Sequence, residues 1–409
     1  MKEEKREEEE KKIASPLKYK LTRRDFLKKG IVGLAGLSLG YYLLEEFFLK
    51  NLPENNLVFR KNAPEKLWKW SKEAYFYERF PSYVKCRLCP HGCILNEGDR
   101  GRCRVRVNFK GRLYTLVYGN PCAVHIDPIE KKPLFHFLPG SFAFSIATAG
   151  CNLRCKYCQN WEISQFPPEE TKNYDLMPEN LVRAVTLERK KNERLRSIAY
   201  TYSEPTVFYE YMSDTARISK KEGIRNVVIT AGYINEKPLK ELAKNVDAIK
   251  IDLKGFNERF YREVVEGELE RVLKSCKISY KKAKCFEIVN LVVPTLNDSL
   301  DEIRELSRWI KENLSRDVPL HFSRFYPRYK LKNLPPTPLE TLKKAREIAL
   351  EEGLNFVYIG NVPHGEHENT YCPKCGKLLI ERIGYFVKEN NIIEGRCKFC
   401  GERIPGVWE

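Results

Sequence analysis

Glutamine is nearly absent from this 409-residue chain, which has only Gln159 and Gln165 among abundant lysine and glutamate. A low content of glutamine is typical of heat-adapted proteins. A long apolar run is also missing near the N-terminus, where the uncharged stretch 31–44 has fourteen residues. A membrane-spanning helix needs about twenty. The hydrophobic fraction of 42% nevertheless excludes global disorder and allows a sizeable core.

The net charge of +17 is not accompanied by a recognition helix or by a ribbon of interleaved basic and aromatic residues. Much of the charge lies in lysine–glutamate mixtures, which are typical of solvated helix faces. We therefore expect no nucleic-acid partner. A nucleic-acid-binding zinc ribbon is the competing hypothesis, and it predicts a steep salt dependence of binding.

Residues 22–28, Thr-Arg-Arg-Asp-Phe-Leu-Lys, match the twin-arginine export consensus S/T-R-R-x-F-L-K at every position. The mildly apolar stretch 31–44 follows, as in such signals, without a small-x-small cleavage site or a lipid-anchor cysteine. The pattern predicts a signal or membrane anchor over 1–50 in a membrane-associated or extracytoplasmic protein. The alternative is a buried or amphipathic helix of a cytoplasmic protein that happens to contain Arg-Arg.

From residue 141 onward, short apolar runs alternate with helix-like segments. The runs cover 142–148, 196–202, 226–231, 248–253, 286–293 and 318–325, with a seventh short strand at 356–359. The helical segments cover 178–191, 205–221, 236–245, 257–274, 299–314 and 337–352. This alternation predicts βαβ units and a parallel sheet. We expect an α/β fold with a partial (β/α)6 TIM-like barrel over 141–362, and a doubly wound open sheet is the alternative.

Cysteine is abundant, and most of the fourteen cysteines fall into three tight clusters, which favours metal sites over disulfides. Cys151, Cys155 and Cys158 form a C-x3-C-x2-C run directly after the first predicted strand. One short loop can thereby aim three thiolates at an iron–sulfur cube. A four-iron cluster normally takes four cysteines, so three leave one iron open for chemistry. Barrels of this kind carry their chemistry at the C-terminal ends of strands, where this loop lies.

Polar residues follow the next strands of the predicted barrel. Ser203 and Glu204 offer a hydroxyl and a carboxylate to a ligand ammonium, although Glu204 has helix capping as an alternative role. Asp252 and Lys254 follow the fourth strand and are expected either to pair with each other or to face a ligand. Further candidates are Thr230, at the end of the third strand, and His321 and Arg324, which are candidates for lining a substrate cavity.

Two other cysteine sets flank the barrel. In the C-terminal segment 363–409, two C-x-x-C-G knuckles predict a four-thiolate site for zinc, or for iron as in rubredoxin: Cys372, Cys375, Cys397 and Cys400. That tail has too little apolar material to fold alone, so metal binding would stabilise it. In the N-terminal extension 51–140, a second metal or cluster is predicted on Cys86, Cys89, Cys93 and Cys103, with zinc and a four-iron cluster both open. Nearby, 67–80 is expected to be helical and 112–118 a strand.

The Cys151–Cys158 run, with the aromatic Tyr157 between its last two cysteines, resembles the signature of the radical S-adenosylmethionine (SAM) superfamily. More broadly, the chain resembles the AmmeMemoRadiSam-system radical SAM enzymes, relatives of pyruvate formate-lyase activating enzyme. The segments that carry this resemblance are 86–91, 130–136, 151–160, 201–205 and 367–373. Ser203 and Glu204 stand where glycyl-radical activators commonly have Gly-Gly-Glu.

The resemblance implies a [4Fe-4S] cluster on Cys151, Cys155 and Cys158, with SAM chelating the open iron and yielding a 5′-deoxyadenosyl radical on one-electron reduction. It implies SAM-facing roles for the following residues: Tyr157, Ser203, Glu204, Thr230, Asp252 and Lys254. The expected partners are a small-molecule, peptide or protein substrate and an electron donor such as ferredoxin or flavodoxin. A glycyl-radical-activating activity is one hypothesis, and a membrane-tethered electron-transfer protein is the alternative from another class.

Overall fold

The computed structural model describes residues 54–55, 65–363 and 365–409. Its centre is an eight-stranded sheet in the order β16-β15-β14-β13-β12-β11-β9-β8, in which every neighbouring pair except β8–β9 is parallel. The strands are β8 (Ala123–Pro128), β9 (Phe142–Ala147), β11 (Leu195–Tyr200), β12 (Arg225–Thr230), β13 (Ala248–Asp252), β14 (Cys285–Val292), β15 (Leu320–Arg324) and β16 (Val357–Gly360). Their apolar side chains are mostly buried on both faces, as expected for a parallel sheet covered by helices.

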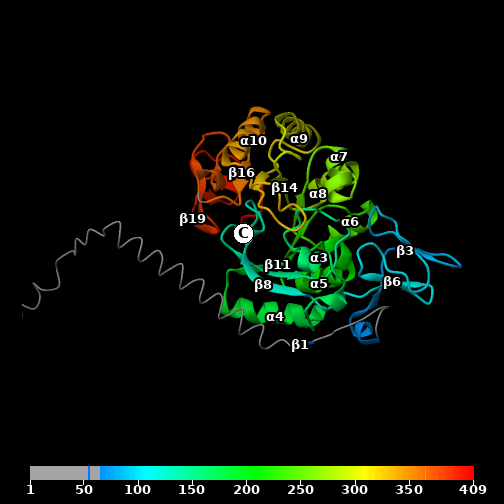
Figure 1. Ribbon diagram of the computed structural model, residues 1–409. Helices are drawn as coiled ribbons and strands as arrows, with labels where there is room; N and C mark the ends of the chain where they lie inside the picture. Colours follow the sequence, from blue (N-terminus) through cyan, green and yellow to red (C-terminus); the bar gives the residue numbers. More distant parts are fainter. Residues whose placement is uncertain (1–53, 56–64, 364) are drawn as a thin grey trace, which may run out of the picture. The chain divides into compact units, whose positions relative to one another are not determined.

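Helices alternate with these strands and lie along the outside of the sheet (Figure 1). They are α4 (Pro178–Lys191), α5 (Tyr209–Lys221), α6 (Glu236–Leu242), α8 (Leu269–Lys282), α9 (Leu300–Asn313) and α10 (Leu339–Glu351). In α9 the buried positions are Ile303, Leu306, Ser307 and Ile310, the spacing of one helical face. The parallel strands β9 to β16 follow one another in chain order, without the reversal of a doubly wound sheet, and in the described part of the chain no ladder joins β16 to β8; the fold is therefore the α/β partial barrel that was predicted.

The helix predicted over 257–274 is wrong in its position. The chain instead forms the short helix α7 (Glu258–Phe260), a π-helical turn (Tyr261–Val265) and then α8, which begins at Leu269. Glu266 has a φ of 60°, in the left-handed region, and a helix cannot continue through that conformation. The backbone break at Glu266 therefore shifts the main helix toward the C-terminus.

The helix predicted over 67–80 is also wrong. This stretch contains the end of a 3-10 helix (Glu65–Trp70), then β2 (Lys72–Glu73) and β3 (Tyr77–Arg79). Its aromatic residues pack across strands and not along a helical stripe: the ring of Trp68 lies 4.7 Å from that of Phe109 and 5.3 Å from that of Tyr114. The strands of this N-terminal module are completed by β4 (Val84–Cys86), β5 (Ile94–Leu95), β6 (Arg106–Phe109) and β7 (Arg112–Thr115). Part of the strand predicted over 112–118 is thus present as β7.

The C-terminal tail packs against the barrel through a shared apolar cluster. Its strands are β17 (Thr370–Tyr371), β18 (Leu378–Ile383), β19 (Phe386–Asn390), β20 (Ile392–Ile393) and β21 (Arg396–Cys397). Leu379 and Ile380 of β18 pack with Phe135 and with Tyr358 of β16. Phe135 lies in the segment 129–140, which connects β8 to β9 and begins with a 3-10 turn (Ile129–Lys131).

Smaller elements complete the chain: β1 (Glu54–Asn55) pairs with β10 (Asn173–Tyr174), and short helices cover Trp161–Ser164, Pro168–Glu170, Pro205–Phe208 and Glu366–Glu368. The predicted twin-arginine signal falls outside the described residues. Among the helices that are described, none combines the length and apolar character needed to cross a bilayer.

Candidate functional site

The loop after β9 carries the three cysteines of the C-x3-C-x2-C run. It turns at Gly150, whose φ is +90°, and a Cβ there would lie 2.6 Å from the carbonyl oxygen of Cys103. Only glycine fits this close approach between two cysteine-bearing segments. Beyond the turn, the amide nitrogen of Leu153 donates to Cys151 Sγ at 3.3 Å. The loop thus points a backbone dipole at its first sulfur.

The three thiols lie close to charged side chains. Burial raises the pKa of Cys155 to about 12, while the ammonium of Lys254 acts to lower it. Burial also raises the pKa of Cys151, and the carboxylate of Glu204 raises it further. Cys158 Sγ lies 3.1 Å from the hydroxyl of Ser164. A cation that stabilises thiolates therefore lies beside this loop.

Neighbouring segments fix the loop on its far side. The amides of Arg154 and Lys156 donate to the carbonyls of Val265 and Val264 at 2.9 and 3.0 Å. These acceptors belong to the π-helical turn, where i→i+5 bonding is typical of functional sites. Consequently the π-helical turn, which interrupts the helix predicted over 257–274, also positions the cysteine loop.

Tyr157 is buried between the last two cysteines and has a relative exposure of 5%. Its ring stacks on that of Phe260, with centroids 6.1 Å apart. Its hydroxyl is buried without a hydrogen-bond partner among the described residues. A buried hydroxyl of this kind is costly unless another group satisfies it, so it is a candidate ligand contact.

The end of β11 places Ser203 and Glu204 beside the cysteine loop. The hydroxyl of Ser203 donates to the carbonyl of Thr148 at 2.8 Å. Glu204 caps the following 3-10 helix, because its Oε1 accepts from the amide of Thr206 at 3.1 Å. The same oxygen accepts from the hydroxyl of Thr230, and Oε2 accepts from the amide of Ala231 at 2.8 Å. The capping alternative is therefore realised, and Oε2 retains acceptor capacity.

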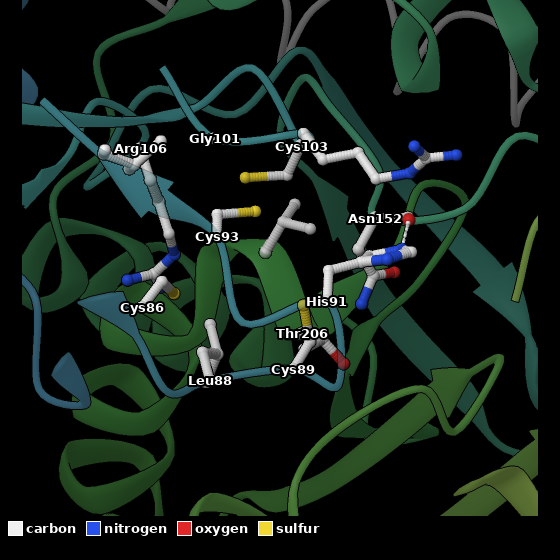
Figure 2. Close-up of a pocket in the computed structure, with 13 residues that line it drawn as sticks. Cys86, Leu88, Cys89, His91, Cys93, Gly101, Cys103, Arg106, Asn152 and Thr206 are labelled. Atoms are coloured by element: carbon white, nitrogen blue, oxygen red, sulfur yellow. Dashed lines mark hydrogen bonds between the residues drawn. The ribbon is translucent and has the colours of Figure 1, made fainter. Parts of the chain in front are cut away.

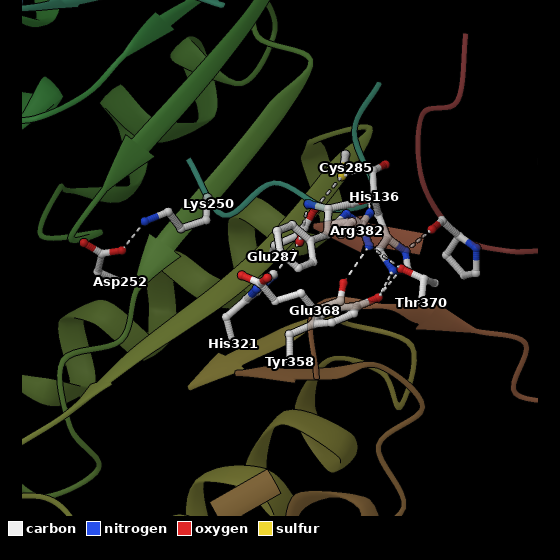
Figure 3. Close-up of polar contacts among 12 residues, drawn as sticks. His136, Lys250, Asp252, Cys285, Glu287, His321, Tyr358, Glu368, Thr370 and Arg382 are labelled. Atoms are coloured by element: carbon white, nitrogen blue, oxygen red, sulfur yellow. Dashed lines mark hydrogen bonds and ion pairs between the residues drawn. The ribbon is translucent and has the colours of Figure 1, made fainter. Parts of the chain in front are cut away.

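Asp252 ends β13, and Figure 3 shows it paired with Lys250. It pairs with Lys254 at 2.9 Å and also with Lys250. Despite burial, the two ammonium groups hold the pKa of Asp252 well below its usual range. Lys250 was missed in the sequence, although a lysine inside the apolar run 248–252 was a visible signal. The predicted pairing of Asp252 with Lys254 is confirmed.

A second buried polar group lies deeper in the barrel (Figure 3). His321 Nε2 lies 2.7 Å from Glu287 Oε2, and both side chains are at most 2% exposed. Glu287 also accepts from the amides of Phe135 and His136 at 3.1 and 2.8 Å. His321 is thus held by Glu287. Sequence reasoning missed Glu287, because a single acidic residue in an apolar strand does not indicate which residue it pairs with.

His136 and Arg382 connect this network to the C-terminal tail. His136 Nδ1 donates to the carbonyl of Pro405 at 2.7 Å, so Nε2 accepts from the hydroxyl of Tyr358 at 2.8 Å. Burial lowers the pKa of His136 to about 4, which keeps the ring neutral. Arg382 donates to the carbonyl of Phe135 at 2.8 Å. The other predicted cavity residue, Arg324, donates to the carbonyl of Thr337 at 2.7 Å.

The two flanking cysteine sets are each brought together. In the tail, the sulfur atoms of Cys372 and Cys400 lie 3.6 Å apart, and those of Cys375 and Cys397 lie 3.8 Å apart. Thiolates at the usual Zn–S distance of about 2.3 Å occupy tetrahedron corners roughly 3.8 Å apart. The tail therefore has the geometry of a four-thiolate metal site. The N-terminal set lines a single cavity: Cys86, Cys89, Cys93 and Cys103.

Comparison with known proteins agrees with this arrangement. The family described as the Radical SAM superfamily matches residues 145–310. The chain is 50% identical over 339 residues to Uncharacterized protein MJ0808 of Methanocaldococcus jannaschii, covering 82% of this chain and 99% of that protein. It is 26% identical over 224 residues to pyruvate formate-lyase 1-activating enzyme of Escherichia coli K12, covering 51% and 89% of the two chains. It is 27% identical over 170 residues to the pyruvate formate-lyase-activating enzyme of Clostridium pasteurianum, covering 40% and 66%. The chain therefore belongs to the radical SAM superfamily and is related to the pyruvate formate-lyase activating enzymes.

Proposed function

We propose that Cys151, Cys155 and Cys158 bind three irons of a [4Fe-4S] cluster, and that the fourth iron is open to SAM. The observation that carries this proposal is the three-thiol loop at the C-terminal end of β9, with Cys155 buried and Cys151 and Cys158 partly buried, in a chain of this superfamily. The chemistry that the bound cluster and SAM supply is reductive cleavage of SAM, giving a 5′-deoxyadenosyl radical for hydrogen abstraction from a substrate.

The residues around the loop fit such a group. Three thiolates add negative charge, and the ammonium of Lys254 lies close enough to Cys155 and Cys158 to stabilise them. Cys155 is buried and the other two cysteines are partly buried, which limits the access of water to a reduced cluster and a radical. The unpartnered hydroxyl of Tyr157 supplies a polar contact for a ligand in the same region.

Side chains at the strand ends would orient SAM. We assign Glu204 Oε2 to the methionyl ammonium, since Oε1 is committed to capping. Ser203 and Thr230 position this carboxylate and the neighbouring backbone. Asp252 carries its charge between two lysines and faces the same end of the barrel.

The finer features of the proposal rest on sequence resemblance. They are membership of the AmmeMemoRadiSam-system enzymes, a small-molecule, peptide or protein substrate, a ferredoxin or flavodoxin donor, and structural zinc in the tail. Export through the twin-arginine signal, with membrane association, belongs to the same proposal.

Anaerobic reconstitution tests the assignment. The wild-type protein, reduced in the presence of SAM, is expected to release 5′-deoxyadenosine, detected by mass spectrometry. Cys151→Ala should abolish this product, while Cys276→Ala, a buried cysteine outside the three clusters, should not. Product formation by Cys151→Ala would contradict the proposal. Redox cycling of the wild type without product would instead support an electron-transfer protein.

A further inference from the structure

The four N-terminal cysteines surround one cavity next to the three-cysteine loop. Figure 2 shows the side chains of Cys93 and Cys103 with their sulfur atoms pointing toward each other, and Cys89 below them. The cavity has a volume of about 20 Å³, and Leu88, Leu95 and Val207 contribute to its apolar lining. Four potential thiolate ligands therefore enclose a space that protein side chains do not fill.

The spread of these sulfur atoms distinguishes this site from the tail. Among the described residues, the C-terminal four cysteines are the one set of three or more whose ligand atoms all lie within 4.8 Å of one another. The N-terminal thiols are farther apart, too far to meet at a single zinc ion without rearrangement. In a four-iron cube each thiolate binds a different iron, so the sulfur atoms stand farther apart.

Polar groups around the cavity also match an anionic cluster. Arg106 lines it and is 2% exposed, and its Nε has no hydrogen-bond partner among the described residues, although its other nitrogens bind Glu210. An Nε–H group can donate a hydrogen bond to a sulfide or thiolate sulfur. The buried guanidinium of Arg106 therefore lines the same cavity as the four cysteines.

The histidine of the module, His91, is held by the segment that carries the three-cysteine loop. His91 Nε2 lies 2.7 Å from the carbonyl oxygen of Asn152, so the ring donates that nitrogen's hydrogen to the backbone. Its ring also packs against that of Tyr233, with centroids 5.0 Å apart. These contacts tie the N-terminal module to the residue next to Cys151, beside the cavity that the four cysteines line.

We propose that Cys86, Cys89, Cys93 and Cys103 bind a second four-iron cluster, ligated entirely by cysteine, and not a structural zinc ion. This cluster lies beside the loop of the first one. Asn152, the neighbour of Cys151, lines the cavity, and the carbonyl of Cys103 packs on Gly150. The assignment does not depend on SAM chemistry at the first cluster.

Metal analysis of the full-length protein, reconstituted anaerobically with iron and sulfide, tests the proposal. The wild type is expected to hold about eight irons and one zinc per chain, with a Mössbauer spectrum of four-iron clusters. The triple variant Cys151→Ala/Cys155→Ala/Cys158→Ala should keep about four irons, with an electron paramagnetic resonance signal that SAM does not change. Cys89→Ala/Cys103→Ala should lose about four irons, and Cys276→Ala should lose none.

Other outcomes separate the two proposals. About four irons and two zinc ions in the wild type, with none of the iron left in the triple variant, would overturn the second cluster. About four irons that survive the triple variant and vanish in Cys89→Ala/Cys103→Ala would support the second cluster and contradict the first. If the N-terminal variant fails to fold, the wild-type and triple-variant metal contents still decide.

Discussion

Removing the charge of Glu210 should destabilise the protein strongly, because Glu210 and Arg106 form a fully buried ion pair. Their side chains are 0% and 2% exposed, and two hydrogen bonds of 3.2 and 2.5 Å join them. Glu210→Gln keeps the size of the side chain but leaves the guanidinium uncompensated. Breaking one partner of a buried pair costs about 3–5 kcal/mol.

The exposed pair Arg112–Glu73 is a matched control. Its side chains are 50% and 42% exposed at a distance of 2.8 Å, so Glu73→Gln should cost at most about 1 kcal/mol. The assay is guanidinium unfolding under anaerobic conditions, followed by tryptophan fluorescence, with equal metal content in all samples. Arg106→Met/Glu210→Met should be less destabilised than Glu210→Gln, because it leaves no unpaired charge. If Glu210→Gln is no worse than Glu73→Gln, the reasoning about burial is refuted.

Three further predictions concern the rest of the molecule. Burial raises the pKa of Glu130 from 4.5 to about 7, so the folded state keeps a proton that the unfolded state releases, and stability falls as pH rises through this window. The wild type should therefore lose about 3 kcal/mol of unfolding free energy between pH 4.5 and 8, and Glu130→Gln should not show this loss. Unfolding measured at several pH values tests this, and the same pH dependence in both proteins would contradict it. Cys397→Ala should reduce the zinc content of the tail from about one ion per chain to nearly none, and it should make the tail sensitive to protease. Metal analysis and limited proteolysis measure these effects, and full zinc content in the variant would argue against a four-thiolate site. Lys254→Met should lower the reduction potential of the first cluster in a redox titration, since a nearby cation favours the more negative reduced state. Lys244 is exposed, so Lys244→Met should leave the potential unchanged. Equal potentials in both variants would contradict a role for Lys254.

Local patterns predicted much of the barrel. Each of the seven predicted strands is present within two residues of its expected start, because runs such as 142–148 and 226–231 carry apolar residues on both faces and need no partner to be recognised. The predicted helix over 257–274 failed at Glu266, whose left-handed backbone is set by packing against the cysteine loop. β8 was missed, since an edge strand with a charged and a proline residue at its end carries a weak periodic signal.

The sequence by itself determined which cysteines of one run act together, because ligands three to ten residues apart must share one loop or hairpin whatever the rest of the chain does. The two knuckles of the tail are farther apart, and their matching C-x-x-C-G spacing predicted that they form one site. Only the tertiary structure decided how far apart the sulfurs stand. It brought the tail's thiols to a single point and held those near Arg106 around a wider space. It also joined Phe135 to Arg382 and Glu287 to His321. Such contacts and sulfur–sulfur distances depend on how segments far apart in the sequence pack together. No local sequence pattern indicates them.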